Sequence, residues 1–133
     1  MKFIMARLLL APALLLSGAE VAAAASMAVD SIERGLWRLQ VEGERSRDLC
    51  IGDIGALIQI HHPRAACNRL VIANDGRRTT VHYSCPGTGW GRTIVHVLTP
   101  RSVMIDTQGI AAGAPFAFSA RAHHVGDCNS PRR

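Results

Sequence analysis

The segment that begins and ends with cysteine, residues 67–85, constrains the fold of this 133-residue chain most strongly. Its sequence, CNRLVIANDGRRTTVHYSC, holds two stretches of alternating side chains on either side of Asn-Asp-Gly. Alternation with a period of two is typical of a half-buried strand, and Asn-Asp-Gly favours a tight turn because these residues tolerate positive φ. We therefore predict a β-hairpin over residues 67–85 with its turn at residues 74–76.

The register of this hairpin predicts a disulfide. Directly opposed residues of an antiparallel hairpin have numbers with a constant sum, and a turn centred on Gly76 places Cys67 opposite Cys85. At a non-hydrogen-bonded pair the Cα atoms lie about 4.5 Å apart, within the range that disulfides accept. We predict the disulfide Cys67–Cys85 and, by elimination, Cys50–Cys128.

Redox chemistry or a metal thiolate site is the alternative role for these cysteines. Redox sites usually use C-x-x-C with a lowered thiol pKa, whereas the closest cysteines here are 17 positions apart. An even number of cysteines in a small exported domain favours a disulfide framework instead. We therefore assign all four cysteines to structural disulfides.

Residues 1–25 predict export. Lys2 and Arg7 give a positive start, residues 8–18 form an apolar run, and alanines follow. This order is typical of a secretory signal peptide, and the run is shorter than the roughly 20 residues that span a bilayer. We expect cleavage after Ala25, or one or two residues earlier. The mature chain is then periplasmic or secreted from a bacterium, with no transmembrane segment.

The charge of the mature chain argues against nucleic acid as a partner. Without residues 1–25 the chain loses two of its 15 basic residues and one of its 10 acidic residues, which leaves a net charge of +4. The remaining basic residues are all arginines, but they are scattered and aromatic residues are few. Nucleic-acid surfaces need clustered positive charge, with aromatic platforms for single strands. We therefore predict no binding to nucleic acid.

The rest of the chain predicts a mainly β domain. Residues 26–34 form a polar lead-in, and residues 35–42 alternate as a first strand. Residues 43–48 form a charged turn, and residues 50–60 favour one or two helical turns capped by Asp53. After the hairpin we expect strands at residues 90–98, 103–108 and 116–124, with turns at residues 86–89 and 99–102 and a Gly/Ala loop at residues 109–115.

Strands at such short spacing predict an antiparallel meander of about six strands. A single sheet exposes one apolar face, so we expect it to curl over the short helix or to close partly into a half-barrel. One disulfide-stapled domain would then cover residues 35–128, followed by a frayed tail at residues 129–133.

The histidines are the remaining candidates for chemistry, at positions 61, 62, 82, 96, 123 and 124. Adjacent histidines on a strand point to opposite faces, and the sequence has no H-x-H or H-x-x-x-H spacing. No G-x-S-x-G marks a nucleophile, although Asp106 and Asp127 are candidates to pair with a histidine. We predict no catalytic residue, no metal ligand and no cofactor.

The order of several motifs resembles a known family. These motifs are GLW (35–37), CIGD (50–53), AC (66–67), YSC (83–85), G-x-G (87–89) and HHVGDC (123–128). The order resembles the domain-of-unknown-function family 3617, whose members are small exported proteobacterial proteins with four cysteines. The resemblance spans nearly the whole mature chain and implies a periplasmic or secreted β-rich domain, without carrying over catalytic residues. The chain departs from the family in its less acidic residues 51–59 and in His123–His124.

A looser likeness to lipocalins rests on G-x-W in the first strand. That likeness implies that Arg121 packs on Trp37, and it is a fold-level analogy with little functional weight. We expect a monomeric, non-enzymatic domain that binds a small apolar or amphipathic ligand inside the curled sheet, or an envelope protein. The alternative function is a small envelope hydrolase or metal-binding protein that uses histidines.

Overall fold

The computed structural model describes residues 27–129, which form one antiparallel sheet, a 3-10 turn and a short helix. The strands are β1 (Gly35–Val41), β2 (Arg47–Ile51), β3 (Asn68–Asn74), β4 (Arg78–Cys85), β5 (Gly89–Thr99), β6 (Ser102–Ala111) and β7 (Ala114–Gly126). The 3-10 turn η1 covers Ala28–Ser31, and helix α1 covers Gly55–Ile58. The predicted signal peptide and the end of the predicted tail lie outside the described residues. Within residues 27–129, no helix has the length and apolar character needed to cross a membrane.

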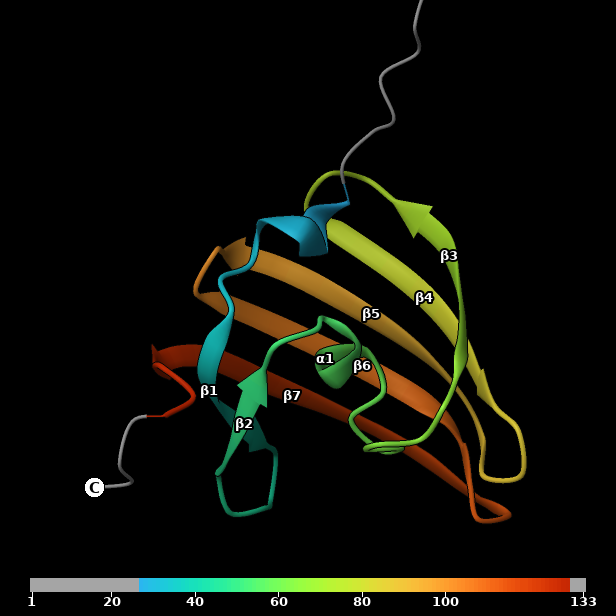
Figure 1. Cartoon of the computed structure of the whole chain (residues 1–133). Helices are drawn as coiled ribbons and strands as arrows, with labels where there is room; N and C mark the ends of the chain where they lie inside the picture. Colours follow the sequence, from blue (N-terminus) through green and yellow to red (C-terminus); the bar gives the residue numbers. More distant parts are fainter. Residues whose placement is uncertain (1–26, 130–133) are drawn as a thin grey trace, which may run out of the picture.

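The strands follow the order β2-β1-β7-β6-β5-β4-β3, so β2 and β3 form the two edges of the described sheet. Strands β3 to β7 form the predicted meander, and the hairpin of β1 and β2 joins it beside β7. The sheet curls around α1, which lies on its concave side between β2 and β3 (Figure 1). The predicted class, a curled and incompletely closed antiparallel sheet with one short helix, is confirmed with seven strands.

Side chains fill the concave face. Trp37 of β1, Tyr83 of β4 and Leu57 of α1 are completely buried. The Thr93 hydroxyl of β5 donates a hydrogen bond to the Ile58 carbonyl over 2.6 Å and thereby ties α1 to the sheet. The segment at residues 51–66, which we call the plug, therefore occupies the space in which the sequence led us to expect a ligand.

Both predicted disulfides are present, Cys67–Cys85 and Cys50–Cys128. The Cα atoms of Cys67 and Cys85 lie 4.1 Å apart, and the pairs from the cysteines to Val71 keep the predicted register. A β-bulge after Val71 then shifts the pairing by one residue.

The hairpin turn is closed by Asp75. Its Oδ1 accepts hydrogen bonds from the backbone N–H groups of Arg77 and Arg78 at 3.2 and 2.8 Å. The N–H of Arg78 and that of Arg77 lower the pKa of the Asp75 carboxyl, because both stabilise the ionised form. The Asn-Asp-Gly sequence thus stabilises the turn in two ways, through the hydrogen bonds that the Asp75 carboxylate accepts and through the positive φ of Gly76.

Three segments differ from the prediction. The predicted charged turn at residues 43–48 is too long, because β2 already begins at Arg47. Helix α1 agrees with the expected one or two turns, since it is a single turn, but its N-cap residue is Ile54 rather than Asp53, which accepts a hydrogen bond from the Gly55 N–H over 2.7 Å. The predicted loop at residues 109–115 is mostly strand. The polar lead-in at residues 26–34 contains η1, whose Ala28 and Val29 are buried.

The lipocalin-like contact between Arg121 and Trp37 is wrong. Ala120 and Ala122 of β7 are buried, so Arg121 between them lies on the exposed face. Trp37 instead meets the ring of His124 edge-on, with ring centroids 5.9 Å apart. Its indole N–H donates a hydrogen bond to a backbone carbonyl over 2.9 Å.

Candidate binding groove

A groove of about 400 Å³ lies between the two edges of the curled sheet. Its walls come from β2, from the plug and from the start of β3. The apolar part of its lining includes Leu49, Ala56, Ile60 and Pro63. The groove exists because the sheet stops short of closure and the plug fills only part of the gap.

The charges in the groove favour an anion. Three arginines line it, Arg47, Arg64 and Arg69, against a single carboxylate, Asp53. The Asp53 Oδ1 lies 3.6 Å from Nη1 of Arg69, an ion pair that neutralises part of this charge. The guanidinium group binds carboxylates well because its planar N–H groups match both oxygens. The groove therefore combines apolar walls with a positive balance.

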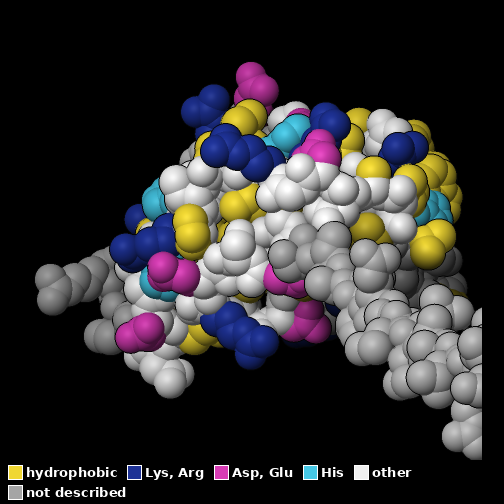
Figure 2. All heavy atoms as spheres, turned by 90° about the horizontal axis from the view of Figure 1, so that it is seen from above, with side chains coloured by type: hydrophobic (Ala, Val, Ile, Leu, Met, Phe, Trp, Pro, Cys, Tyr) yellow, Lys and Arg dark blue, Asp and Glu magenta, His cyan; other side chains and the backbone are white. Residues whose placement is uncertain are grey.

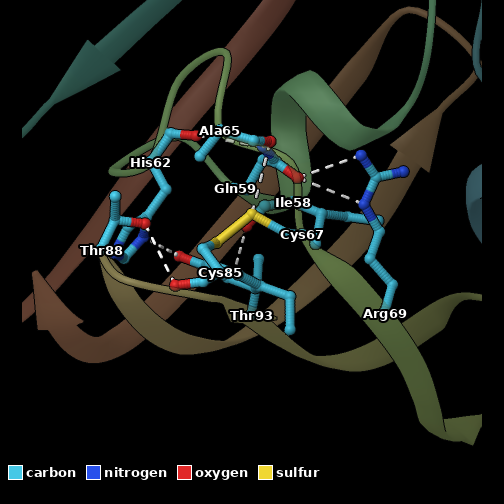
Figure 3. The surroundings of a disulfide bond; sticks show 10 residues. Ile58, Gln59, His62, Ala65, Cys67, Arg69, Cys85, Thr88 and Thr93 are labelled. Carbon is cyan, nitrogen blue, oxygen red and sulfur yellow. Dashed lines mark hydrogen bonds between the residues drawn. A yellow bond between two sulfur atoms is a disulfide. The ribbon is translucent and has the colours of Figure 1, made fainter.

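Gln59 holds the groove together. Its side-chain N–H group donates hydrogen bonds to the carbonyls of His62 and Ala65 at 3.0 and 2.9 Å. Its Oε1 accepts from Nε and Nη2 of Arg69 at 3.3 and 3.0 Å (Figure 3). Because Gln59 is only 6% exposed, its amide makes these bonds from a buried position and fixes the plug and Arg69. The sequence signal was a lone amide inside the apolar run of residues 56–60.

The first position of α1 is occupied by Gly55 rather than by a good helix former, because the side chain of Arg69 passes close to it. A Cβ atom at this position would overlap the guanidinium group of Arg69. Glycine costs a helix about 1 kcal/mol relative to alanine. Here its small size lets Arg69 cross directly over the helix toward Gln59.

The disulfides lie at both ends of the plug. Cys50 precedes it and is bonded to Cys128 beyond β7, while Cys67 follows it and is bonded to Cys85 at the end of β4. Figure 3 shows the disulfide Cys67–Cys85 beside Gln59. The cysteines therefore position the candidate site without taking part in its chemistry.

A chain of polar groups runs through the core behind the plug. The Thr93 hydroxyl donates to a carbonyl and lies 2.8 Å from the Thr107 hydroxyl, which is hydrogen-bonded to Tyr83. The Tyr83 hydroxyl lies 3.1 Å from Nδ1 of His62. The buried Nε2 of His62 has no hydrogen-bond partner among the described residues.

We predict an alkaline loss of stability that depends on Tyr83. Burial raises the pKa of its phenol above the usual value of about 10, although the bond to Thr107 opposes this. The stabilisation from the neutral phenol is complete below about pH 10 and is lost as the pH rises through the folded-state pKa. The chain has one tyrosine. Phenolate absorbance should therefore titrate at higher pH in the native chain than in urea.

The Tyr83→Phe variant is the control for this titration. It keeps the ring but has no ionisable group, so its stability should no longer fall in the alkaline range. Native and denatured titration curves that coincide would show that burial does not protect the phenol.

The histidines are spread over the fold. His61 stacks on Phe116 with ring centroids 4.3 Å apart, and His82 lies 5.6 Å from the ring of Trp90 on the outer face. Across residues 27–129, no three His, Cys, Asp or Glu residues are grouped closely enough to hold a metal ion. None of the histidines within the described part of the chain lines the groove.

One expected pairing between an aspartate and a histidine does occur. Asp106 Oδ2 lies 3.4 Å from Nε2 of His96, and Asp106 Oδ1 accepts a hydrogen bond from the Ser119 hydroxyl over 2.5 Å. Activation of a serine requires the histidine to contact the hydroxyl directly. Here the carboxylate lies between the two, so this exposed arrangement does not match a nucleophilic triad.

Known proteins do not assign a role to these residues. No protein-family model, curated protein or solved structure matches the chain. The function must therefore be inferred from the shape, contacts and charges of the groove.

Proposed function

We propose that this chain is an exported binding domain whose groove holds a small amphipathic molecule with a carboxylate. The observation that carries the proposal is the set of three arginines around an apolar groove. Its volume of about 400 Å³ lies within the range of roughly 300–1,000 Å³ typical of small-molecule sites. The apolar chain of the ligand would lie along Leu49 and Ile60, and its carboxylate would meet Arg47 or Arg64.

Binding is preferred over catalysis because of how the polar groups are used. Gln59 and Arg69 bond to each other and to the plug, so they serve to shape the groove. The hydrolase or metal-binding alternative requires histidines that act together, and no specific contact favours it. Export is supported by two disulfides, which form and persist in oxidising compartments.

A fluorescent fatty acid tests the proposal. Dansyl-labelled undecanoic acid should bind the purified chain with increased emission, and its methyl ester should bind more weakly because it lacks the charge. In Arg64→Gln the loss of one charge-assisted hydrogen bond, about 1.5–3 kcal/mol, should weaken binding of the acid about tenfold or more. The same variant should bind the ester almost as well as the wild type does.

Arg92→Gln is the matched control, because Arg92 lies in β5 outside the groove. It removes the same charge and should leave the affinity for the acid unchanged. Equal affinity for acid and ester, or equal losses in the two variants, would contradict the proposal. Native mass spectrometry of the protein purified from its exporting host should show an acidic lipid-sized adduct that Arg64→Gln retains less well.

A further inference from the structure

Strand β3 is an exposed and unusually apolar edge. Leu70, Val71 and Ile72 are 67%, 43% and 48% exposed. Edge strands are commonly protected by charge or proline, because their free backbone groups pair readily with another strand. The seven residues of β3 contain one charge, Arg69, and no proline.

The register shows which backbone groups of β3 are free. The short Cα distance at Cys67–Cys85, 4.1 Å, is that of a non-hydrogen-bonded pair. Pair types alternate along an antiparallel ladder, so Arg69 and Val71 also occupy non-hydrogen-bonded positions. Their N–H and C=O groups therefore point away from β4. Within the described residues no strand pairs with β3 on that side.

The sequence of β3 is nearly symmetric about Val71. It runs Asn-Arg-Leu-Val-Ile-Ala-Asn. In an antiparallel pair of two such strands centred on Val71, asparagine meets asparagine at the ends and Leu70 meets Ile72. Arg69 meets Ala73, so the charge of one strand does not face the charge of the other. A two-fold axis requires such self-complementarity, because both copies offer the same surface.

We propose that β3 pairs antiparallel with β3 of a second copy of this chain. Val71 then exchanges two backbone hydrogen bonds with its own copy across the two-fold axis. The bulge that follows Val71 interrupts the ladder further out, so the apolar side chains supply the remaining contact. Figure 2 shows hydrophobic side chains gathered on the side where β3 and β4 lie. Among the exposed hydrophobic residues, Trp90 lies next to β4, in β5.

Arg69 borders both this surface and the groove, whereas Leu70, Val71 and Ile72 do not line the groove, and the dimer does not depend on the proposed ligand. The sequence alone led us to expect a monomer. The free hydrogen-bonding groups at Val71 and the symmetry of the strand change that expectation.

Sedimentation at several protein concentrations tests the dimer. The wild type should shift from the mass of one chain to twice that mass as its concentration rises. Val71→Glu and Val71→Lys should each remain at the mass of one chain, because like charges then face each other across the axis. An equimolar mixture of the two variants should recover the doubled mass, since a glutamate then meets a lysine. The mixture recovers the doubled mass only if residue 71 of one chain faces residue 71 of the other.

Leu98→Glu is the matched control, because Leu98 is 53% exposed in β5 and lies outside the proposed interface. It adds the same charge and should dimerise as the wild type does. Thermal melts identify any variant that has lost its fold. If Val71→Glu or Val71→Lys has lost its fold, the uncharged variant Val71→Thr replaces that variant and should dimerise. A wild type that stays a monomer at millimolar concentration would overturn the proposal. A Val71→Glu dimer, or a mixture that does not recover, would also overturn it.

Discussion

Replacement of Cys50 and Cys128 by alanine is expected to lower the free energy of unfolding by about 4.5 kcal/mol. The two cysteines are 78 positions apart, so their disulfide removes much of the conformational freedom of the unfolded chain. Domains of this size are stable by only about 5–15 kcal/mol, so the loss would leave a marginal fold. In the native state the variant also removes the covalent link between the edge strand β2, which stays paired with β1, and the segment after β7.

Urea denaturation followed by circular dichroism measures this effect. The matched comparison is Cys67→Ala with Cys85→Ala, whose 18-position separation predicts a smaller loss of about 3 kcal/mol. The order of the two midpoints is therefore part of the prediction. A larger loss for the shorter loop would indicate that native contacts around Cys67, rather than the freedom of the unfolded chain, control the stability.

Replacement of Trp37 by alanine is expected to cost about 3–5 kcal/mol. Trp37 is completely buried, packs against His124 and donates its indole N–H to a carbonyl. Truncation therefore leaves a large cavity in the core and removes the hydrogen bond to the Glu33 carbonyl. The same urea experiment measures the loss, with Trp37→Phe as a milder variant if the alanine chain does not fold.

Trp90 supplies the control, because the chain has two tryptophans and Trp90 is 42% exposed on the outer face. Trp90→Ala should cost less than about 1 kcal/mol, as is usual for a partly exposed side chain. Similar losses for the two variants would show that the concave face is not the main core. Each single-tryptophan chain also reports separately on its remaining indole.

The hairpin could be predicted because several signals agreed. Cysteines at both ends, alternation between them and Asn-Asp-Gly in the middle all indicated one register, and the pairs near the cysteines keep it. The bulge after Val71 was not visible, because a single extra residue changes neither composition nor alternation enough to be detected. Strand β1 was predicted for the same reason, since its buried residues alternate strictly.

Strand β2 was missed because it lies at an edge. Most of its residues are exposed, so alternation between buried and exposed positions is absent. The first residues of β7 were missed for a different reason. They belong to a Gly/Ala-rich stretch with low strand propensity, and pairing with β6 decides their conformation.

The groove could not be predicted from local patterns. It brings together Arg47, Arg64 and Arg69, which belong to β2, the plug and β3. In the sequence these arginines are separated from one another and stand out from no other arginine. They meet around one opening only because the edge strands β2 and β3 do not pair with each other. Gln59 left a trace as an amide in an apolar run, but its partners depend on the path of the plug.

The attachment of the plug at both ends has a consequence for engineering. Residues 51–66 are held between two covalent anchors, much as a peptide is held in a macrocycle. New sequences grafted here would keep their end points even if they had no preferred conformation of their own. A library that retains the buried residues of the plug, among them Leu57, Ile58, Gln59 and Ile60, and varies the exposed positions would turn the domain into a display scaffold. Reducing conditions would then release the grafted loop from both anchors at once.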